Sequence, residues 1–409
     1  MGIYNASAKD LKLKILNVIR NKGQVTKQEI ARYLNFNLTT ITNLVNELLI
    51  SHKLLQEVGD NVSTGGRKPK LYQININSGN IIGLDIGGEN LRIVMCDIMG
   101  NVISSLTSRS QYNGNREKLI DGILNLIEKI IANAGYNKSS IFGIGISISG
   151  IVDSDSGNII YCPNIDGLDN FQIKNFLESK TDFSVFVDDS VRCMAIAEKH
   201  YGIAKEYDNF LFISLGKGIG MGIYVNGKIY RGSIGLSGEL GHITVNEDGP
   251  LCNCGNKGCL EAIASGPGII RRAREGIENG IVTLLTQIIK GDLKNLTVET
   301  ISKAAEEGDK FSYYLINRTG EYIGIAVAAV LNLFGPELVV LGGGVAKCGD
   351  VMIDAIRRTV QLRALSVISK KARIVRSELE DNIAARGAAT KFINILFNDP
   401  NNNLLSKII

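Results

Sequence analysis

The chain has 409 residues, which is too long for one ordinary hydrophobic core and is enough for two or three domains. Its composition, 44% hydrophobic and 21% charged, argues against a disordered chain. The lack of an apolar run of about 18 residues or a basic leader predicts a cytoplasmic protein with no membrane partner. Residues 1–75 hold 11 Lys and Arg against 5 Asp and Glu, a net charge of +6 against −2 for the remainder, which is typical of a small nucleic-acid-binding module on a near-neutral body.

Three short helices are predicted at the start of the chain. Apolar residues recur at helical spacing over residues 8–20, and Asn21-Lys-Gly23 supplies a stop signal. Thr26 and Glu29 form a capping box for a second helix that ends near Leu34. A third helix follows the turn Asn35-Phe-Asn37, with a buried face predicted at Leu38, Ile41, Val45 and Leu48. This order is that of a helix-turn-helix.

The opposite face of the third helix carries small polar side chains. Such groups let a helix enter a major groove and bond base edges or phosphates. A merely solvated face has a similar composition. On the DNA-binding interpretation, the contacting residues are Asn37, Thr39, Thr40, Thr42 and Asn43.

A wing is predicted after the helices. Strands over residues 54–58 and 71–74 enclose a glycine-rich loop in which Arg67 and Lys68 form a cationic finger suited to an A·T-rich minor groove. The alternative is a hairpin with incidental charge. Helix pattern, charge and wing together predict a winged helix-turn-helix DNA-binding domain over residues 1–76. We expect it to bind an A/T-rich inverted repeat in double-stranded operator DNA as a homodimer.

Alternating strands and helices follow from residue 80 onward. This alternation predicts an α/β body with partly parallel sheets. Strands are expected over residues 81–86, 91–97, 101–107, 141–147, 185–188, 210–214 and 338–341, and helices over 116–134, 191–201, 312–333 and 381–397.

Three glycine-rich turns come directly after predicted strands. They are Asp85-Ile-Gly-Gly88, Leu215–Gly222 and Leu341–Val345. Glycines at strand ends let the backbone approach a phosphate or nucleoside, and the set resembles the phosphate-1, phosphate-2 and adenosine loops of the hexokinase and actin-like ATPase fold. Glycines that only allow two lobes to pack are the alternative interpretation.

One histidine and three cysteines have the spacing of a metal site. Three soft thiolate ligands and one imidazole make four protein ligands, which match a closed tetrahedral, structural Zn²⁺ with no position left for a catalytic water. The predicted ligands are His242, Cys252, Cys254 and Cys259. The other cysteines have no metal-like spacing and are expected to be buried thiols.

The run Ser237-Gly-Glu-Leu-Gly-His242, followed by the three cysteines and Glu261, resembles the signature of the ROK family of repressors, open reading frames and sugar kinases. The resemblance covers essentially the whole chain and is greatest to the repressor branch, which includes the xylose repressors. It implies a two-lobed sugar-kinase fold, with a first α/β lobe over residues 77–190 plus 382–409 and a second, carrying the zinc loop, over 191–381. It also implies a sugar site at Asn164, Asp189, Glu239, His242 and Glu261.

Departures from the family's kinases bear on activity. Ser190 stands where the kinases carry the general-base Asp, and a hydroxyl is too weak a base near pH 7 to replace it; losing a general base costs roughly 10²- to 10⁴-fold in rate. Glu89 and Lys217 replace threonines of the phosphate-1 and phosphate-2 loops. These changes predict a protein that is not an enzyme.

The sequence therefore predicts a transcription repressor of carbohydrate-utilisation genes, controlled by a sugar or sugar phosphate in a catalytically inactive kinase-like cleft. Arg192 bears on the choice of ligand, because a positive charge beside the missing carboxylate lets the pocket accept a neutral sugar or a sugar phosphate. The alternative is that Arg192 pairs with Asp189 or Glu89 and keeps the cleft closed and empty of nucleotide. Two alternatives stay open. One is an active ROK sugar kinase with a regulatory DNA-binding domain, and the other is a repressor controlled by a partner protein.

Overall fold

The computed structural model describes residues 7–60, 69–110, 114–163, 165–379 and 381–398. The chain falls into two compact units, one of Met1–Cys193 and Ala384–Ile409 and the other of Met194–Ile383. Helix α6 (Ser190–Tyr201) carries the chain from the first unit into the second, and α14 (Ile383–Asn398) begins where it returns. No helix among the described residues is long and apolar enough to cross a membrane.

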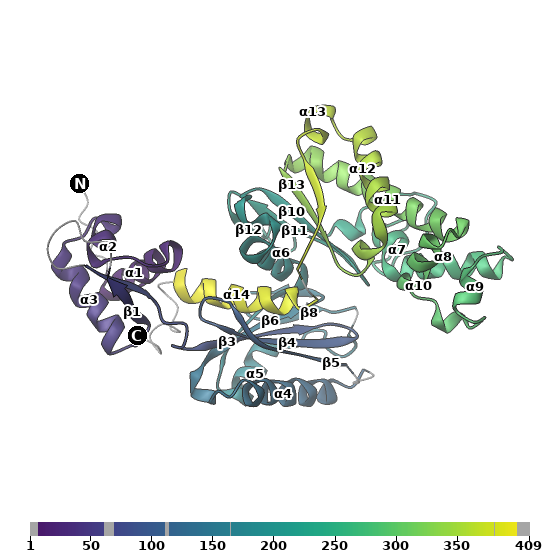
Figure 1. The fold of residues 1–409 in the computed structure, drawn as a ribbon. Coiled ribbons are helices and arrows are strands. Elements are labelled where there is room, and N and C mark those ends of the chain that lie inside the picture. Colours follow the sequence, from purple (N-terminus) through teal and green to yellow (C-terminus); the bar gives the residue numbers. More distant parts are fainter. Residues whose placement is uncertain (1–6, 61–68, 111–113, 164, 380, 399–409) are drawn as a thin grey trace. The chain divides into compact units, whose positions relative to one another are not determined.

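The first unit begins with three helices and a two-stranded antiparallel sheet (Figure 1). Ser7 and Thr26 each begin a helix with a capping box. The hydroxyl oxygen of each accepts a hydrogen bond from the backbone N–H three residues later, and the acidic side chain at that later position accepts one from the backbone N–H of the capping residue. Ile41, Val45 and Leu48 are buried as predicted, whereas Leu38 is 45% exposed, so its assignment to the buried face was wrong. The elements are α1 (Ala8–Lys22), α2 (Lys27–Leu34), α3 (Leu38–Ile50), β1 (Leu55–Asp60) and β2 (Lys70–Ile74).

A five-stranded sheet follows in the first unit, in the order β5-β4-β3-β6-β9. Strands β3, β4 and β5 are antiparallel neighbours, and β3, β6 and β9 are parallel. Helices α4 (Arg116–Asn133) and α5 (Ile173–Thr181) cover one face, and α14 lies on the other (Figure 1). The strands are β3 (Asn80–Ile86), β4 (Asn90–Asp97), β5 (Val102–Arg109), β6 (Ile141–Ile148) and β9 (Ser184–Asp189), with a small pair β7 (Ile151–Asp153) and β8 (Asn158–Tyr161) beside them and η1 (Lys138–Ser140) before β6.

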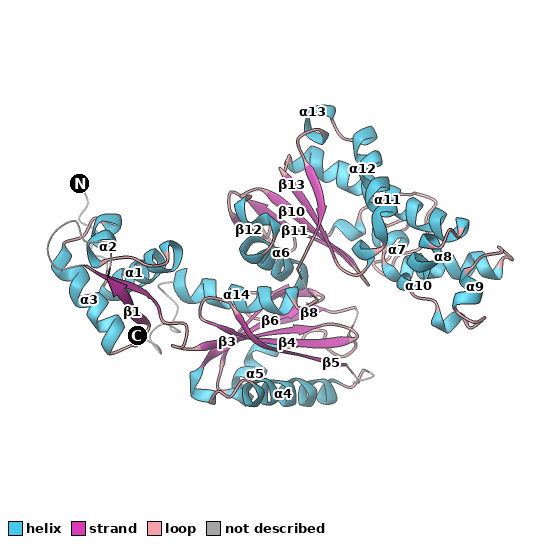
Figure 2. Cartoon of the chain, in the orientation of Figure 1, coloured by secondary structure: helices cyan, strands magenta, loops and turns pink. Residues whose placement is uncertain are grey.

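The second unit contains a sheet of the same pattern, in the order β12-β11-β10-β13-β14 (Figure 2). Again three consecutive strands are antiparallel and the last two join in parallel. The strands are β10 (Phe210–Leu215), β11 (Ile219–Val225), β12 (Lys228–Tyr230), β13 (Leu338–Gly342) and β14 (Arg373–Arg376). This repeated topology places the first two glycine turns at equivalent hairpins, β3–β4 and β10–β11, and the third after a parallel strand.

The helices of the second unit form a second core with this sheet. The sheet and the long helix α11 contribute many of its buried residues, and α11 packs against α12 and α10. The helices are α7 (Leu260–Ala264), α8 (Gly266–Glu278), α9 (Leu285–Ile288), α10 (Val298–Glu306), α11 (Lys310–Phe334), α12 (Gly349–Arg363) and α13 (Ser366–Ser369), with short turns η2 (Ile203–Glu206), η3 (Leu240–His242), η4 (Leu293–Asn295) and η5 (Val345–Lys347).

Candidate functional site

The four residues predicted as metal ligands lie together. Their ligand atoms are all within 4.8 Å of one another. Cys252 Sγ is 3.7 Å from His242 Nδ1, and Cys254 Sγ is 3.7 Å from Cys259 Sγ. A tetrahedron with metal–sulfur bonds of about 2.3 Å has edges of about 3.8 Å, so the cluster has the size and donor set to hold a metal ion such as zinc.

The backbone of the loop explains how these ligands converge. The Cys252 N–H donates to Asn256 O, and the Gly255 N–H donates to Cys252 O, which makes a tight turn between two ligands. Gly258 has φ of +72°, and a Cβ there would lie 1.7 Å from Asn246 O. Only glycine fits at that position, and it directs the next residue, Cys259, into the cluster.

The three thiols differ in how readily they ionise. Burial, and then the neighbouring thiols, raise the pKa of Cys259 to about 12. Burial also raises the pKa of Cys252, while a backbone hydrogen bond at Asn256 is the main cause that lowers that of Cys254. Since thiolates are the metal-binding form, a bound cation would offset the cost of ionising this group.

Glu239 and His242 are brought together by the glycines between and before them. A Cβ on Gly238 would lie 1.9 Å from Met221 O, and one on Gly241 would lie 2.3 Å from Ile219 O, so this segment packs directly on the backbone of β11. The result places Glu239 Oε2 3.9 Å from His242 Nε2. His242 thus has one ring nitrogen toward the thiol cluster and the other toward a carboxylate proposed to bind sugar.

Glu261 is held at the second glycine turn. It lies in the first turn of α7, two residues after the predicted ligand Cys259, and its Oε2 accepts a hydrogen bond of 2.8 Å from the Ile219 N–H. A Cβ on Gly218 would lie 2.8 Å from the same oxygen. Glu261 therefore fixes the β10–β11 turn with one carboxylate oxygen, a positioning role that the sequence did not indicate.

The segment around Ser190 belongs to the first unit. Asp189 Oδ1 accepts from the backbone N–H groups of Val191 and Arg192, so this carboxylate, predicted to bind sugar, also caps the start of α6. Ser190 is 4% exposed, and Ser149 Oγ lies 3.3 Å from its Oγ. The position carries a buried hydroxyl in a hydroxyl pair.

Arg192 has a buried partner, Asp188, that the sequence analysis did not name. Its Nε donates to Asp188 Oδ1 at 2.7 Å, and the side chains are 5% and 2% exposed. Burial lowers the pKa of Arg192, but the charges of Asp188 and Asp189 outweigh it and the net shift is upward. Asp188 is the residue that the sequence reasoning missed; its place four residues before Arg192, at the end of an apolar strand, was the available signal.

Asp85, the acid of the first glycine turn, is also engaged within the protein. It is 6% exposed, Ser147 Oγ donates to its Oδ1 at 2.8 Å, and Arg92 lies 3.6 Å from Oδ2. Burial raises the pKa of Asp85, although Ser147 and Arg92 act in the opposite direction. The carboxylate thus has a structural partner on two neighbouring strands, β4 and β6.

The predicted DNA-binding face of α3 is formed by its first two turns. Asn37 is the N-cap, and its Oδ1 accepts from the Thr40 N–H at 2.8 Å. Thr39 and Asn43 are exposed, whereas Thr40 and Thr42 are half-buried. The predicted wing contacts, Arg67 and Lys68, and the predicted sugar contact Asn164 lie outside the described residues.

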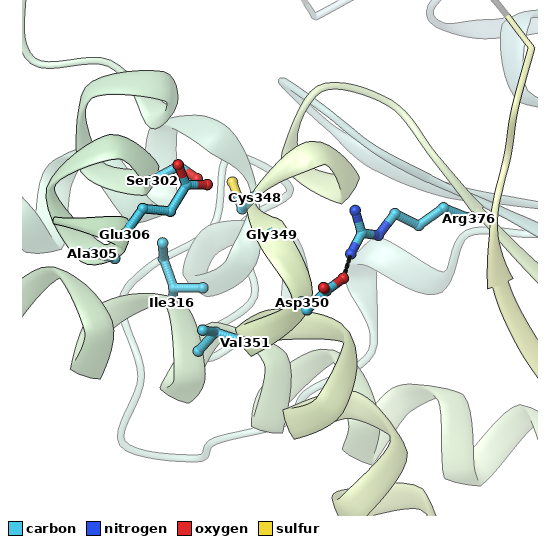
Figure 3. Close-up of a pocket in the computed structure, with 9 residues that line it drawn as sticks. All are labelled: Ser302, Ala305, Glu306, Ile316, Cys348, Gly349, Asp350, Val351 and Arg376. Atoms are coloured by element: carbon cyan, nitrogen blue, oxygen red, sulfur yellow. Dashed lines mark hydrogen bonds and ion pairs between the residues drawn. The ribbon is translucent and has the colours of Figure 1, made fainter. Parts of the chain in front are cut away.

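A cavity of about 290 Å³ lies in the second unit near the third glycine turn (Figure 3). Its lining comes from α10, α11, the start of α12 and Arg376 of β14, whose guanidinium is bonded to Asp350. Among the described residues, none of those predicted to bind sugar or metal lines this cavity. It is therefore separate from the zinc loop and from Glu239 and Glu261.

Comparison with known proteins gives these sites a context. A model described as "ROK family" matches residues 81–394. The chain is 29% identical over 98% of its length to 99% of the xylose repressor of Caldicellulosiruptor bescii.

Solved structures are similar over different parts of the chain. A ROK family transcriptional regulator, described as a homologue of the Escherichia coli MLC protein, covers 98% of both chains with a TM-score of 0.83 and 26% identity. A ROK family glucokinase from Streptomyces griseus, in complex with glucose and AMPPNP, covers 76% of this chain and 98% of its own with a TM-score of 0.67 and 28% identity. The kinase thus matches a smaller share of this chain than the regulator does.

Proposed function

The chain belongs to the ROK family, and from that premise we propose that it is a sugar-responsive transcriptional repressor. Its relative over nearly the full length is named a xylose repressor, and its full-length structural counterpart is a transcriptional regulator. The single observation that carries the proposal is this match over the N-terminal helices as well as the α/β body, since the kinase structure covers only 76% of the chain.

DNA binding is assigned to α1–α3 with β1 and β2, in a winged helix-turn-helix. Asn37 is assigned first to capping α3, because its side-chain oxygen is used in that role. Exposed Thr39 and Asn43 are proposed to contact bases or phosphates, with Thr40 and Thr42 beside them. The operator is proposed to be an A/T-rich inverted repeat bound by a homodimer, with Arg67 and Lys68 in the minor groove.

The sugar site is proposed to use Glu239, His242 and Glu261 of the second unit, together with Asp189 and Asn164. Carboxylates and a ring nitrogen suit the hydroxyl groups of a neutral sugar. Arg192 is satisfied by a buried carboxylate, and an arginine so neutralised gives no net attraction for a phosphate dianion. We therefore favour a free sugar over a sugar phosphate, with D-xylose the first to test because of the xylose-repressor relative.

The metal is proposed to be a structural Zn²⁺ held by His242, Cys252, Cys254 and Cys259. Four protein ligands leave no coordination position for a reacting water. When bound, the ion supplies charge for three thiolates and fixes the loop that precedes Glu261. The protein's own residues then set the distance between Glu239 and His242.

Phosphoryl transfer is not part of the proposed function. Ser190 offers a buried hydroxyl, paired with that of Ser149, where the kinases of the family carry a general base. The alternative of an active sugar kinase predicts ADP release with a sugar, and the alternative of control by a partner protein predicts that no sugar binds.

Calorimetry on the full chain tests the proposal. D-xylose and a panel of free pentoses, hexoses and their phosphates are titrated into wild-type protein and into Glu239→Ala. We expect a free monosaccharide to bind the wild type and to lose most of its affinity in Glu239→Ala, with Glu247→Ala, an exposed acid of the same loop region, unchanged. Preference for a phosphorylated sugar would overturn the choice of ligand, and binding of no sugar would overturn sugar sensing.

A further inference from the structure

Helix α14 joins two distant places in the first unit. It begins at Ile383, where the chain returns from the second unit, and ends at Asn398 beside the N-terminal helices. Figure 1 shows it running along the sheet toward α1. At about 1.5 Å per residue its 16 residues span roughly 24 Å.

The N-terminal half of α14 is held at the chain crossings. A Cβ on Gly387 would lie 1.8 Å from Cys193 O, the last residue before the chain enters the second unit. The two crossings are therefore in backbone contact inside the first unit. On the other unit's side, Ser377 Oγ donates to Glu198 Oε2 at 2.7 Å, which links the segment before α14 to α6 again.

The middle of α14 cannot slide over the sheet without a change in its packing. A Cβ on Gly83 of β3 would lie 2.0 Å from Ala385 O, and one on Gly145 of β6 would lie 2.0 Å from Ala388 O. The Phe392 ring sits over Gly143 in the same way and is edge-on to Phe186 at 5.4 Å. The helix is seated by close backbone contacts, so it moves as one body.

The C-terminal half of α14 is bonded to α1. The Arg20 guanidinium donates to Asn394 Oδ1 at 3.0 Å and lies 4.9 Å from the centroid of the Phe397 ring. Asn17 Nδ2 donates to Phe397 O at 2.6 Å. Buried residues of α1–α3, β2, β3, β4 and α14 form one continuous apolar cluster.

We propose that α14 is the mechanical link by which a change at the two chain crossings reaches the DNA-binding helices, with Arg20, Asn17, Asn394 and Phe397 as its contact points. This inference rests on the proposed function. Rearrangement between the units at Cys193–Gly387 displaces or tilts α14, and the tight seating of α14 carries that displacement to α1. Burial of the apolar face of α14 does not by itself require the polar contacts that its C-terminal half makes with α1.

A variant that needs no sugar tests the link first. Gly387→Ala places a methyl group against Cys193 O, while a central helical alanine is itself favoured over glycine. Hydrogen exchange of the full chain and its affinity for DNA from upstream of its own gene are measured. We expect altered exchange in α1 and at least about a fivefold change in DNA affinity.

The matched control is Gly122→Ala on α4, whose Cβ would lie 3.8 Å from Leu91 Cδ1, an ordinary contact; it should change neither quantity. Altered exchange in Gly387→Ala that is confined to α6 and the start of α14, with wild-type α1 and DNA affinity, would overturn the proposal.

A second variant acts at the other end and decides the matter if Gly387→Ala does not fold. In Asn394→Ala, D-xylose should still bind with wild-type affinity, but its effect on DNA affinity should fall at least threefold below that of the wild type. An unchanged effect would overturn the link. If D-xylose changes the DNA affinity of neither the wild type nor Asn394→Ala, the xylose assignment fails. Hydrogen exchange of α1 in Asn394→Ala then tests the link, and exchange like that of the wild type throughout α1 refutes it.

Discussion

The partner of Arg192 determines whether its charge can attract a ligand. The sequence alone allowed two interpretations, a positive group that attracts phosphate or one that pairs with Asp189 or Glu89. In the structure its charge is satisfied by Asp188, and both side chains are buried. The ion pair is therefore part of the lobe's interior, and removing one member leaves the other uncompensated.

We predict that Arg192→Met lowers the free energy of unfolding by about 3 to 5 kcal/mol, because the buried carboxylate of Asp188 loses the guanidinium that offsets its charge. The double variant Arg192→Met with Asp188→Leu should recover most of that loss. Urea denaturation, followed by a spectroscopic signal from the first unit, measures the free energy of unfolding of both variants. Lys138→Ala, which breaks an exposed pair with Glu128, is the control and should cost less than about 1 kcal/mol. A small loss in Arg192→Met would contradict the assignment.

Ser190 leads to a prediction about activity. With a hydroxyl at the base position, ADP release in the presence of any free pentose or hexose should be at least about 100-fold below that of a ROK kinase assayed alongside. A coupled assay of ADP measures it. Turnover comparable to the kinase would show that another group serves as base.

For single residues, the sequence predicted which side chains belong to a candidate site better than it predicted their hydrogen-bond and ion-pair partners. The metal ligands could be predicted because one short loop carries three of them. Asp188 and the Ile219 N–H that binds Glu261 could not, since they come from elements brought together only by folding.

The loop that carries the proposed metal ligands depends on a single glycine for its geometry. Gly258 and Gly255 both have positive φ, but only Gly258 faces backbone, since nothing lies within 4 Å of a Cβ on Gly255. An alanine at Gly255 would therefore suffer only backbone strain, whereas an alanine at Gly258 would also lack space for its methyl group.

We predict that Gly258→Ala lowers the zinc content well below one per chain and weakens sugar binding, because the new methyl group forces Cys259 out of the cluster. Gly255→Ala should keep its zinc and cost only the roughly 1 to 2 kcal/mol of a strained left-handed residue. Metal analysis and thiol titration measure both. Full zinc in Gly258→Ala would show that the loop adapts.

Helices and the longer apolar strands were predicted well, whereas the shortest strands were not. Capping boxes at Thr26 and apolar spacing predicted the first helices closely. Strands β7, β8, β12 and β14 are only three or four residues long and carry no periodicity of their own. Leu38 was misassigned because it lies directly after the N-cap, where the buried stripe has not yet begun.

Over the whole molecule, the repeated strand order of the two sheets and the N-terminal helices fit a regulator built on a sugar-kinase body. One recognition helix reads few base pairs, and this is the reason for the proposal of a homodimer on two half-sites.

We predict that an operator with one half-site scrambled binds at least about 100-fold more weakly than the intact inverted repeat. Sedimentation of the complex should give two chains per DNA. Equal affinity for the half-site and the full site would contradict binding as a dimer.

The most direct measurement is fluorescence anisotropy of labelled DNA from upstream of the protein's own gene, titrated with the full chain in fixed salt, with and without each sugar of the panel. We predict tight binding of the wild type that one free sugar weakens by about 5- to 150-fold, and a Glu239→Ala protein that binds the DNA equally well but ignores the sugar. DNA affinity that no sugar changes, or a response that survives in Glu239→Ala, would contradict a sugar-responsive repressor whose sensor is built on this loop.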